Sequence, residues 1–166
     1  KMIFLNPDDQ HDLMKKHGLN VPEVHILGGI GLNLMDYPYT KAKTSPVKFL
    51  FIGRLLKEKG VFELIQAIRI VKSKYPQAYF TILGAIDHQN MGALKQEELD
   101  SLIAEKLFEY PGYVTNVNQW ITDSSVFVLP SYREGVPRST QEAMAIGRPV
   151  ITTDVPGCRE TVVDGV

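Results

Sequence analysis

The sequence predicts an α/β fold built on a Rossmann-like, doubly wound parallel sheet. Four short apolar runs, each bounded by glycine, proline or charged residues, indicate strands at 47–52, 79–83, 126–129 and 150–153. Helical patterns lie between them at 61–75, 94–108, 118–123 and 137–146. Because strands that alternate with helices form βαβ units, we expect a parallel sheet with helices on both faces.

The first predicted strand is followed by residues suited to an anionic ligand. Gly53 permits a close backbone approach, and Arg54 and Lys59 supply cationic donors before the next helix. Ligands of such sheets bind beyond the carboxyl ends of the strands, and two positive side chains there suit a diphosphate. The alternative is a solvated loop with Arg54 in a surface ion pair.

The strand at 126–129 and the helix at 137–146 carry two glutamates. Glu134 follows the strand, and Glu142 is expected about two turns inside the helix. The free N–H groups and positive dipole end of that helix can hold a diphosphate without a metal. Carboxylates accept hydrogen bonds from hydroxyls, so Glu134 would hold a donor sugar and Glu142 a ribose. The alternative is that the two glutamates occur at this spacing by chance or serve only the helix dipole.

Four motifs occur in order along the chain, at 53–60, 112–116 (GYVTN), 131–150 (SYREGVPRSTQEAMAIGRPV) and 153–165 (TDVPGCRETVVDG). Together they resemble the donor-binding half of a family 4 glycosyltransferase, a retaining enzyme with the two-domain GT-B fold. The resemblance covers about residues 23–166. The segment 132–139 is most similar to bacterial enzymes that build capsular, O-antigen or lipid-linked oligosaccharides.

The resemblance implies a role for individual residues. Arg54 and Lys59 would grip the nucleotide diphosphate, Glu142 the ribose hydroxyls and Glu134 a hydroxyl of the transferred sugar, so that the catalytic residues of this half would be Arg54, Lys59 and Glu134. Backbone groups near Tyr113 and Val114 would contact the base.

The amides after Glu134 would contact the sugar and the phosphates. Proline has no N–H, and Pro137 stands where many relatives have glycine. We expect Pro137 to be the first residue of the helix, where the missing donor costs nothing. The amides that remain are those of Gly135, Val136, Arg138 and Ser139.

Enzymes of this type resemble two Rossmann-like domains that face each other across a cleft, and 166 residues are enough for one of them. We expect residues 1–22 to be the end of an N-terminal acceptor domain and the interdomain crossover. Residues 23–166 would form a nucleotide-sugar donor-binding domain, truncated at its C-terminus. The acceptor pocket would then lie in the absent half, and the isolated fragment would be inactive in transfer.

The predicted function is the donor-binding half of a hexosyltransferase. The parent enzyme would transfer a hexose or N-acetylhexosamine from an NDP-sugar, with UDP-sugar as the expected donor, to a saccharide or lipid-linked acceptor in surface polysaccharide synthesis. No metal or other cofactor is expected. The alternatives are a nucleotide-sugar epimerase domain and a non-catalytic nucleotide-binding module.

The composition and the spacing of residues bear on partners, location and metal binding. Eighteen basic and 19 acidic residues give a net charge of −1, so nothing indicates a nucleic-acid partner. No apolar run has the length of a membrane-spanning helix, and we expect a cytoplasmic domain. Peripheral association of the full-length parent with the inner face of the plasma membrane stays open. The four histidines are scattered without metal-ligand spacing, and Cys158 is expected to be a buried packing residue.

Overall fold

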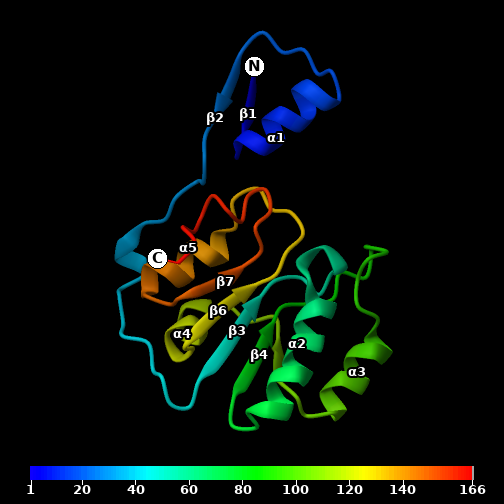
Figure 1. The fold of residues 1–166 in the computed structure, drawn as a ribbon, viewed down its shortest axis with the longest axis vertical. Coiled ribbons are helices and arrows are strands. Elements are labelled where there is room, and N and C mark those ends of the chain that lie inside the picture. The colour runs from blue at the N-terminus through cyan, green and yellow to red at the C-terminus, as the bar shows by residue number, and fades with distance from the viewer. Residues whose placement is uncertain (166) are drawn as a thin grey trace.

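The computed structural model describes residues 1–165 and contains a five-stranded parallel sheet in the order β5-β4-β3-β6-β7 (Figure 1). Its strands are β3 (Lys48–Ile52), β4 (Tyr79–Leu83), β5 (Glu109–Gly112), β6 (Val126–Leu129) and β7 (Val150–Thr152). The helices that connect them are α2 (Val61–Lys74), α3 (Gln96–Ala104), α4 (Val117–Asp123) and α5 (Arg138–Ile146).

Helices cover both faces of this sheet. The chain adds β4 and β5 on one side of β3 and then returns to place β6 and β7 on the other side. Because parallel crossovers are right-handed, this reversal puts α2 and α3 on one face and α4 and α5 on the opposite face, as Figure 1 shows. The predicted Rossmann-like, doubly wound fold is therefore confirmed.

Three local expectations were wrong. The helix expected at 94–108 extends only over Gln96–Ala104, because the chain turns at Lys106, which has a φ of 55°. Strand β5 was not predicted, since its sequence EYPG contains a proline and lacks an apolar run. Pro137 is the N-cap of α5 rather than its first residue.

A second, two-stranded parallel sheet lies at the N-terminal end of the chain (Figure 1). It pairs β1 (Met2–Phe4) with β2 (Val24–Ile26), and α1 (Pro7–His11) continues between them into a π-helix over Asp12–Lys16. The N-terminal segment thus forms a strand followed by a helix. Residues 24–26 pair with β1 rather than with the larger sheet, and the division of the chain into domains near residue 22 remains a prediction.

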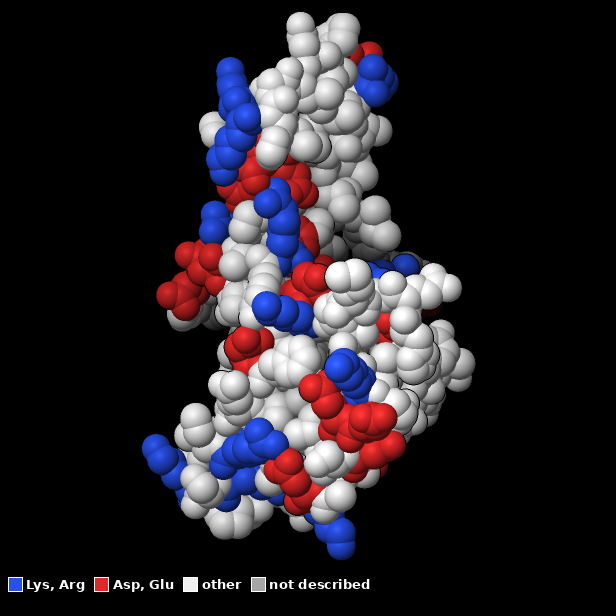
Figure 2. Space-filling view, turned by 90° about the vertical axis from the view of Figure 1, so that its right-hand side faces the viewer, with Lys and Arg blue, Asp and Glu red and all other residues white. Residues whose placement is uncertain are grey.

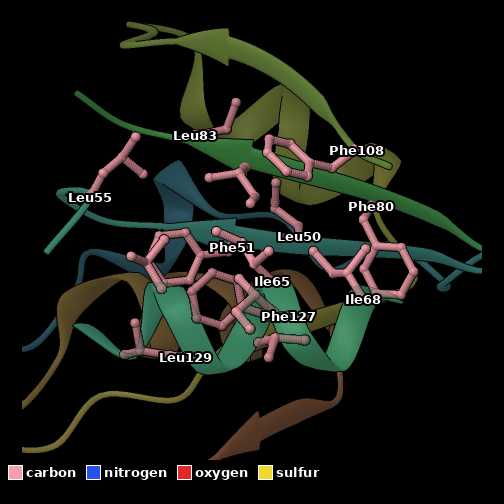
Figure 3. Close-up of a cluster of buried hydrophobic side chains, with 14 of the residues drawn as sticks. Leu50, Phe51, Leu55, Ile65, Ile68, Phe80, Leu83, Phe108, Phe127 and Leu129 are labelled. Atoms are coloured by element: carbon pink, nitrogen blue, oxygen red, sulfur yellow. The ribbon is translucent and has the colours of Figure 1, made fainter. Parts of the chain in front are cut away.

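The core lies between the large sheet and its helices (Figure 3). Helix α2 buries Val61, Leu64, Ile65 and Ile68, a spacing that matches the 3.6-residue period. These side chains pack in one cluster with strand residues such as Phe51. Full burial of each large apolar side chain contributes about 1.5–3 kcal/mol, so the core fixes the strand ends from which the site loops begin.

Charges on the surface are mixed in sign. On the face shown in Figure 2, acidic and basic side chains are interspersed, and neither sign forms one continuous field. Arg69 and Glu105, which form an ion pair between α2 and α3, are an example of this pairing. The distribution agrees with the near-neutral net charge.

Candidate functional site

Three loops leave the carboxyl edge of the sheet with their backbones in contact. The Gly84 amide after β4 donates to the carbonyl of Gly112 at 2.9 Å, and a Cβ at Gly84 would collide with the carbonyl of Gly53. Gly84 has a φ of 140°, which glycine adopts without strain. The missing side chain of Gly84 thus lets this loop pack against the Gly53 carbonyl. A close approach of a ligand to Gly53 remains a prediction.

Lys59 and Glu134 meet at this edge although 75 residues separate them in sequence. The Lys59 Nζ atom lies 2.5 Å from Glu134 Oε1, and the Ser131 hydroxyl donates to the same oxygen at 2.7 Å. The side chains of Lys59 and Glu134 are only 22% and 12% exposed. The cation and carboxylate therefore form a shielded pair whose second carboxylate oxygen, Oε2, accepts no hydrogen bond from residues 1–165.

Glu142 has a similar arrangement on α5. The Tyr37 hydroxyl and the Arg138 Nε atom both donate to Glu142 Oε1, each at 2.9 Å. The Arg138 Nη2 atom also donates to the Tyr37 hydroxyl at 3.4 Å, and this hydrogen bond, followed by the one to Glu142, raises the pKa of the guanidinium. Glu142 is the fifth residue of α5, so it lies little more than one turn into the helix rather than the two turns expected.

A cavity of about 530 Å³ lies beside Glu142. It is bounded by Tyr37, Glu142 and the residues around the start of α4, which are Thr115, Asn116, Val117, Asn118 and Gln119. The cavity has the size of a small-molecule site. It combines a carboxylate with backbone and amide groups, which can form hydrogen bonds with a polar ligand.

The residues expected to contact the base, Tyr113 and Val114, lie outside the lining of this cavity. Tyr113 is 78% exposed, Val114 packs against the core, and neither lines the cavity. Asn116 is the N-cap residue of α4, but its side chain makes no capping hydrogen bond. Base recognition near Tyr113 and Val114 stays a prediction. Of the motif at 112–116, Thr115 and Asn116 line the cavity.

Arg54 has another partner in this structure. Its Nη1 atom lies 2.7 Å from Asp87 Oδ2, on the loop after β4. The Arg54 side chain is 61% exposed, so this surface pair contributes little to stability and can be exchanged for another anion. The structure thus brings together Lys59 with Glu134 and Arg138 with Glu142, and leaves Arg54 in a separate pair.

The amides before and at the start of α5 are available to a ligand. Within residues 1–165, the N–H groups of Gly135, Val136, Arg138 and Ser139 donate no hydrogen bond to the protein. Such free donors at a helix N-terminus, together with the helix dipole, favour an anion. The N-cap Pro137 removes no needed donor.

The N-terminal segment contacts the Glu134 loop directly. The buried Asn6 side chain donates to the carbonyl of Gly135 at 2.8 Å and accepts from the Asp9 amide, so it caps α1 at the same time. Arg133 pairs with Asp9 and, at 2.9 Å, with Asp12. A Cβ at Gly135 would lie 2.6 Å from Leu5, so the two segments are closely packed.

Sequence reasoning missed five residues that form the site's contacts, namely Asn6, Tyr37, Asp87, Ser131 and Arg133. Ser131 lies three residues before Glu134, a spacing that could have indicated a local hydrogen bond. Asn6 precedes Pro7-Asp8-Asp9, a helix-start pattern, but nothing local indicates its contact with residue 135.

Other residues carry less chemistry. Cys158 is buried, as expected, and burial is the main cause that raises the pKa of its thiol. No group of three or more His, Cys, Asp or Glu side chains in residues 1–165 is arranged to hold a metal ion. In the same part of the chain, no helix is long and apolar enough to span a membrane.

Comparison with known proteins gives one family match and several relatives. The model described as "Glycosyl transferases group 1" matches residues 46–166. The capsular polysaccharide biosynthesis glycosyltransferase CapM of Staphylococcus aureus is 30% identical over 133 residues, which are 80% of this chain and 34% of that protein. The N,N'-diacetylbacillosaminyl-diphospho-undecaprenol alpha-1,3-N-acetylgalactosaminyltransferase of Campylobacter jejuni is 27% identical over 175 residues, with 98% and 44% covered.

Solved structures share the fold. Anabaena HepE in complex with UDP superposes with a TM-score of 0.78 at 21% identity, covering 99% of this chain and 47% of that chain. The crystal structure of TarM gives a TM-score of 0.76 at 21% identity, with 92% and 29% covered. The chain therefore spans less than half the length of these relatives.

Proposed function

The chain belongs to the group 1 glycosyltransferases, and from this membership we propose that it binds the nucleotide-sugar donor of a retaining, metal-independent enzyme. The motif resemblance to family 4 enzymes with a GT-B fold is confirmed at the level of the family and the fold. The donor is proposed to be a UDP-sugar that carries a hexose or N-acetylhexosamine.

One observation carries this proposal. Glu134 and Glu142 are held by protein donors in the same way, and free backbone N–H groups lie between them in the sequence. Glu134 and Glu142 each receive two protein donors on Oε1 and none from residues 1–165 on Oε2. A carboxylate oxygen without a protein donor can accept sugar hydroxyls. The N–H groups of Gly135, Val136, Arg138 and Ser139 supply the complementary feature, because they can bind phosphate oxygens.

In the proposed complex, Glu134 holds a hydroxyl of the sugar and Glu142 the ribose. Lys59, Arg54 and the α5 amides neutralise the diphosphate. As the glycosidic bond breaks, negative charge grows on that diphosphate, and donors fixed around it lower the barrier. Arg54 must exchange Asp87 for a phosphate oxygen, which its surface position allows.

Uridine is the proposed nucleoside, with the cavity beside Glu142 as its site. The support for this step is the size and polarity of that cavity and the shared fold with HepE, which was solved in complex with UDP. The names of CapM and of the Campylobacter transferase support a role of the parent in surface polysaccharide synthesis.

The acceptor is proposed to be a saccharide or lipid-linked molecule bound by another part of a longer parent protein. Cytoplasmic location, and peripheral attachment of that parent to the inner face of the plasma membrane, belong to the same proposal. Donor binding can be tested on the present chain, whereas transfer must be tested on the parent, because positioning of the acceptor contributes several kcal/mol to such reactions.

Calorimetry with UDP, GDP, ADP and uridine tests the proposal. Arg54→Ala and Lys59→Ala are each expected to weaken UDP binding by roughly 1.5–3 kcal/mol, tenfold or more, and to leave uridine binding unchanged. Lys57→Ala is the matched control, because Lys57 lies in the same turn as Lys59 and forms no ion pair within residues 1–165.

Three outcomes would contradict this function. If Arg54→Ala or Lys59→Ala weakened the binding of uridine as much as that of UDP, the assignment of that residue to the phosphates would be wrong. No binding of any nucleotide would favour a scaffold, and interconversion of sugar epimers by the parent would favour an epimerase.

A further inference from the structure

We propose that Tyr37 is a positioning residue of the nucleoside site, whose hydroxyl orients Glu142 so that one carboxylate oxygen faces the ribose. The inference rests on the proposed function, because it takes the ribose as the partner of Glu142. Its basis is the hydrogen bond of 2.9 Å from the Tyr37 hydroxyl to Glu142 Oε1, which joins residues 105 positions apart.

The two oxygens of Glu142 have different surroundings. Oε1 receives Tyr37 and Arg138, and the Arg138 Nη2 atom also lies 3.4 Å from the Tyr37 hydroxyl. Oε2 receives no donor from residues 1–165, although the Glu142 side chain is only 13% exposed. A carboxylate oxygen that receives no protein donor is free to accept a hydrogen bond from a ligand hydroxyl.

Tyr37 is itself held before any ligand arrives. It follows a short 3-10 helix, Leu34–Asp36, and the Asn118 side chain donates to the Asp36 carbonyl at 3.0 Å. Three residues later, the Thr40 amide donates to the carbonyl of Ile146 at 2.9 Å. The linker between β2 and β3 (residues 27–47) is thus fastened to α4 and α5 on either side of Tyr37, a residue that is only 9% exposed.

The cavity places this contact next to the proposed nucleoside. Tyr37 and Glu142 both line the 530 Å³ cavity, opposite residues from the start of α4. A glutamate without Tyr37 would sample more rotamers and lose that freedom on binding. Ordering one flexible side chain costs roughly three- to tenfold in affinity, and this is the expected contribution of the tyrosine hydroxyl.

Calorimetry of Tyr37→Phe with UDP, 2′-deoxy-UDP and 3′-deoxy-UDP tests the inference. The substitution keeps the buried ring and removes only the hydroxyl. UDP is expected to bind roughly three- to tenfold more weakly, whereas the analogue that lacks the hydroxyl held by Glu142 changes less. The ratio of the two affinities therefore falls, which a general loss of packing would not produce.

Two further variants sharpen the experiment. Glu142→Gln replaces the carboxylate that is proposed to face the ribose with an amide. When Tyr37→Phe is added to this variant, UDP affinity should change by less than twofold, because the effects of two coupled residues are not additive. Tyr75→Phe is the control, because Tyr75 ends α2 on the exposed surface and its hydroxyl makes no hydrogen bond within residues 1–165. It should leave all three affinities unchanged.

The outcomes separate this inference from the function on which it rests. If the unchanged chain binds UDP and both deoxy analogues equally, the ribose role of Glu142 is wrong. The second case is that the unchanged chain binds UDP more tightly than one of the deoxy analogues. If Tyr37→Phe then leaves the ratio of these two affinities unchanged, or lowers all three affinities equally, the positioning role of Tyr37 is overturned and the proposed function stands.

Discussion

Glu134→Gln should strengthen the binding of UDP and weaken the preference for UDP-sugar over UDP. In the absence of ligand, the Lys59 ammonium lies 2.5 Å from the Glu134 carboxylate. A diphosphate that approaches Lys59 must compete with that negative charge. Glutamine keeps an oxygen for Lys59 and Ser131 but removes the charge, so the cation becomes more available to phosphate.

The magnitude follows from the burial of the pair. Two unit charges 4 Å apart interact by about 4 kcal/mol at an effective dielectric constant of 20. Exposed pairs yield only about 0.2–1 kcal/mol once solvent screening is included. Lys59 and Glu134 are 22% and 12% exposed, which places the pair between these two limits. We expect the phosphate to share Lys59 with residue 134 rather than to displace it. We therefore expect a gain of about 1 kcal/mol, roughly fivefold in UDP affinity.

Calorimetry with UDP and UDP-glucose at two salt concentrations measures this effect. The gain should shrink at high salt, because screening weakens the repulsion between the Glu134 carboxylate and an incoming phosphate; the change should be modest, because the pair is largely shielded. Glu160→Gln is the control, because it removes the same charge from an exposed position without an ion pair within residues 1–165. An unchanged or lower UDP affinity in Glu134→Gln would refute the competition between carboxylate and phosphate.

Three other predictions concern the scaffold. Gly157→Ala should destabilise the fold more than Gly18→Ala in denaturant titrations: both glycines have positive φ, which costs an L-residue about 1–2 kcal/mol, but only at Gly157 would a Cβ collide with the Glu134 carbonyl. Equal losses would contradict the close packing of that loop. The hydrogen bond from Lys16, and then the one from Arg133, lower the pKa of Asp12 below its ordinary value of 3.8. Its contribution is thus present above pH 3.8 and lost as pH falls through the folded pKa, so the stability difference between the unchanged chain and Asp12→Asn should vanish in acid; a difference that persists there would exclude the carboxylate as its source. Cys158 is buried and its pKa is raised, so a thiol reagent should label it slowly in the native protein and rapidly in denaturant; fast native labelling would show that the surrounding loop opens.

The sheet was predictable because its signals are local. Strands β3, β4, β6 and β7 are apolar runs, and their ends agree with the predicted ends within one residue. Strand β5 has no such run, and its partner β4 supplies the pairing that makes it a strand. The start of α5 was also nearly right, with Pro137 one position outside the helix.

The contacts of the site were not predictable in the same way. Motif resemblance selected Lys59, Glu134 and Glu142, but it could not show that Lys59 faces Glu134 across 75 residues. The partner of Glu142 is Tyr37, which belongs to the linker and has no local pattern around it that indicates a site. Such pairs depend on how the linker and strands pack, which the spacing of residues within one element does not encode.

Both site carboxylates are held by one arrangement of protein donors. Each Oε1 accepts one donor from its own strand–helix segment, Ser131 or Arg138, and one from a distant segment, Lys59 or Tyr37. The local donor sets the side chain's direction, and the distant donor fixes that direction relative to the rest of the fold. Because both donors use the same oxygen, the other oxygen remains unpaired within residues 1–165. Mutation of a distant donor should therefore alter ligand selectivity before it alters the fold.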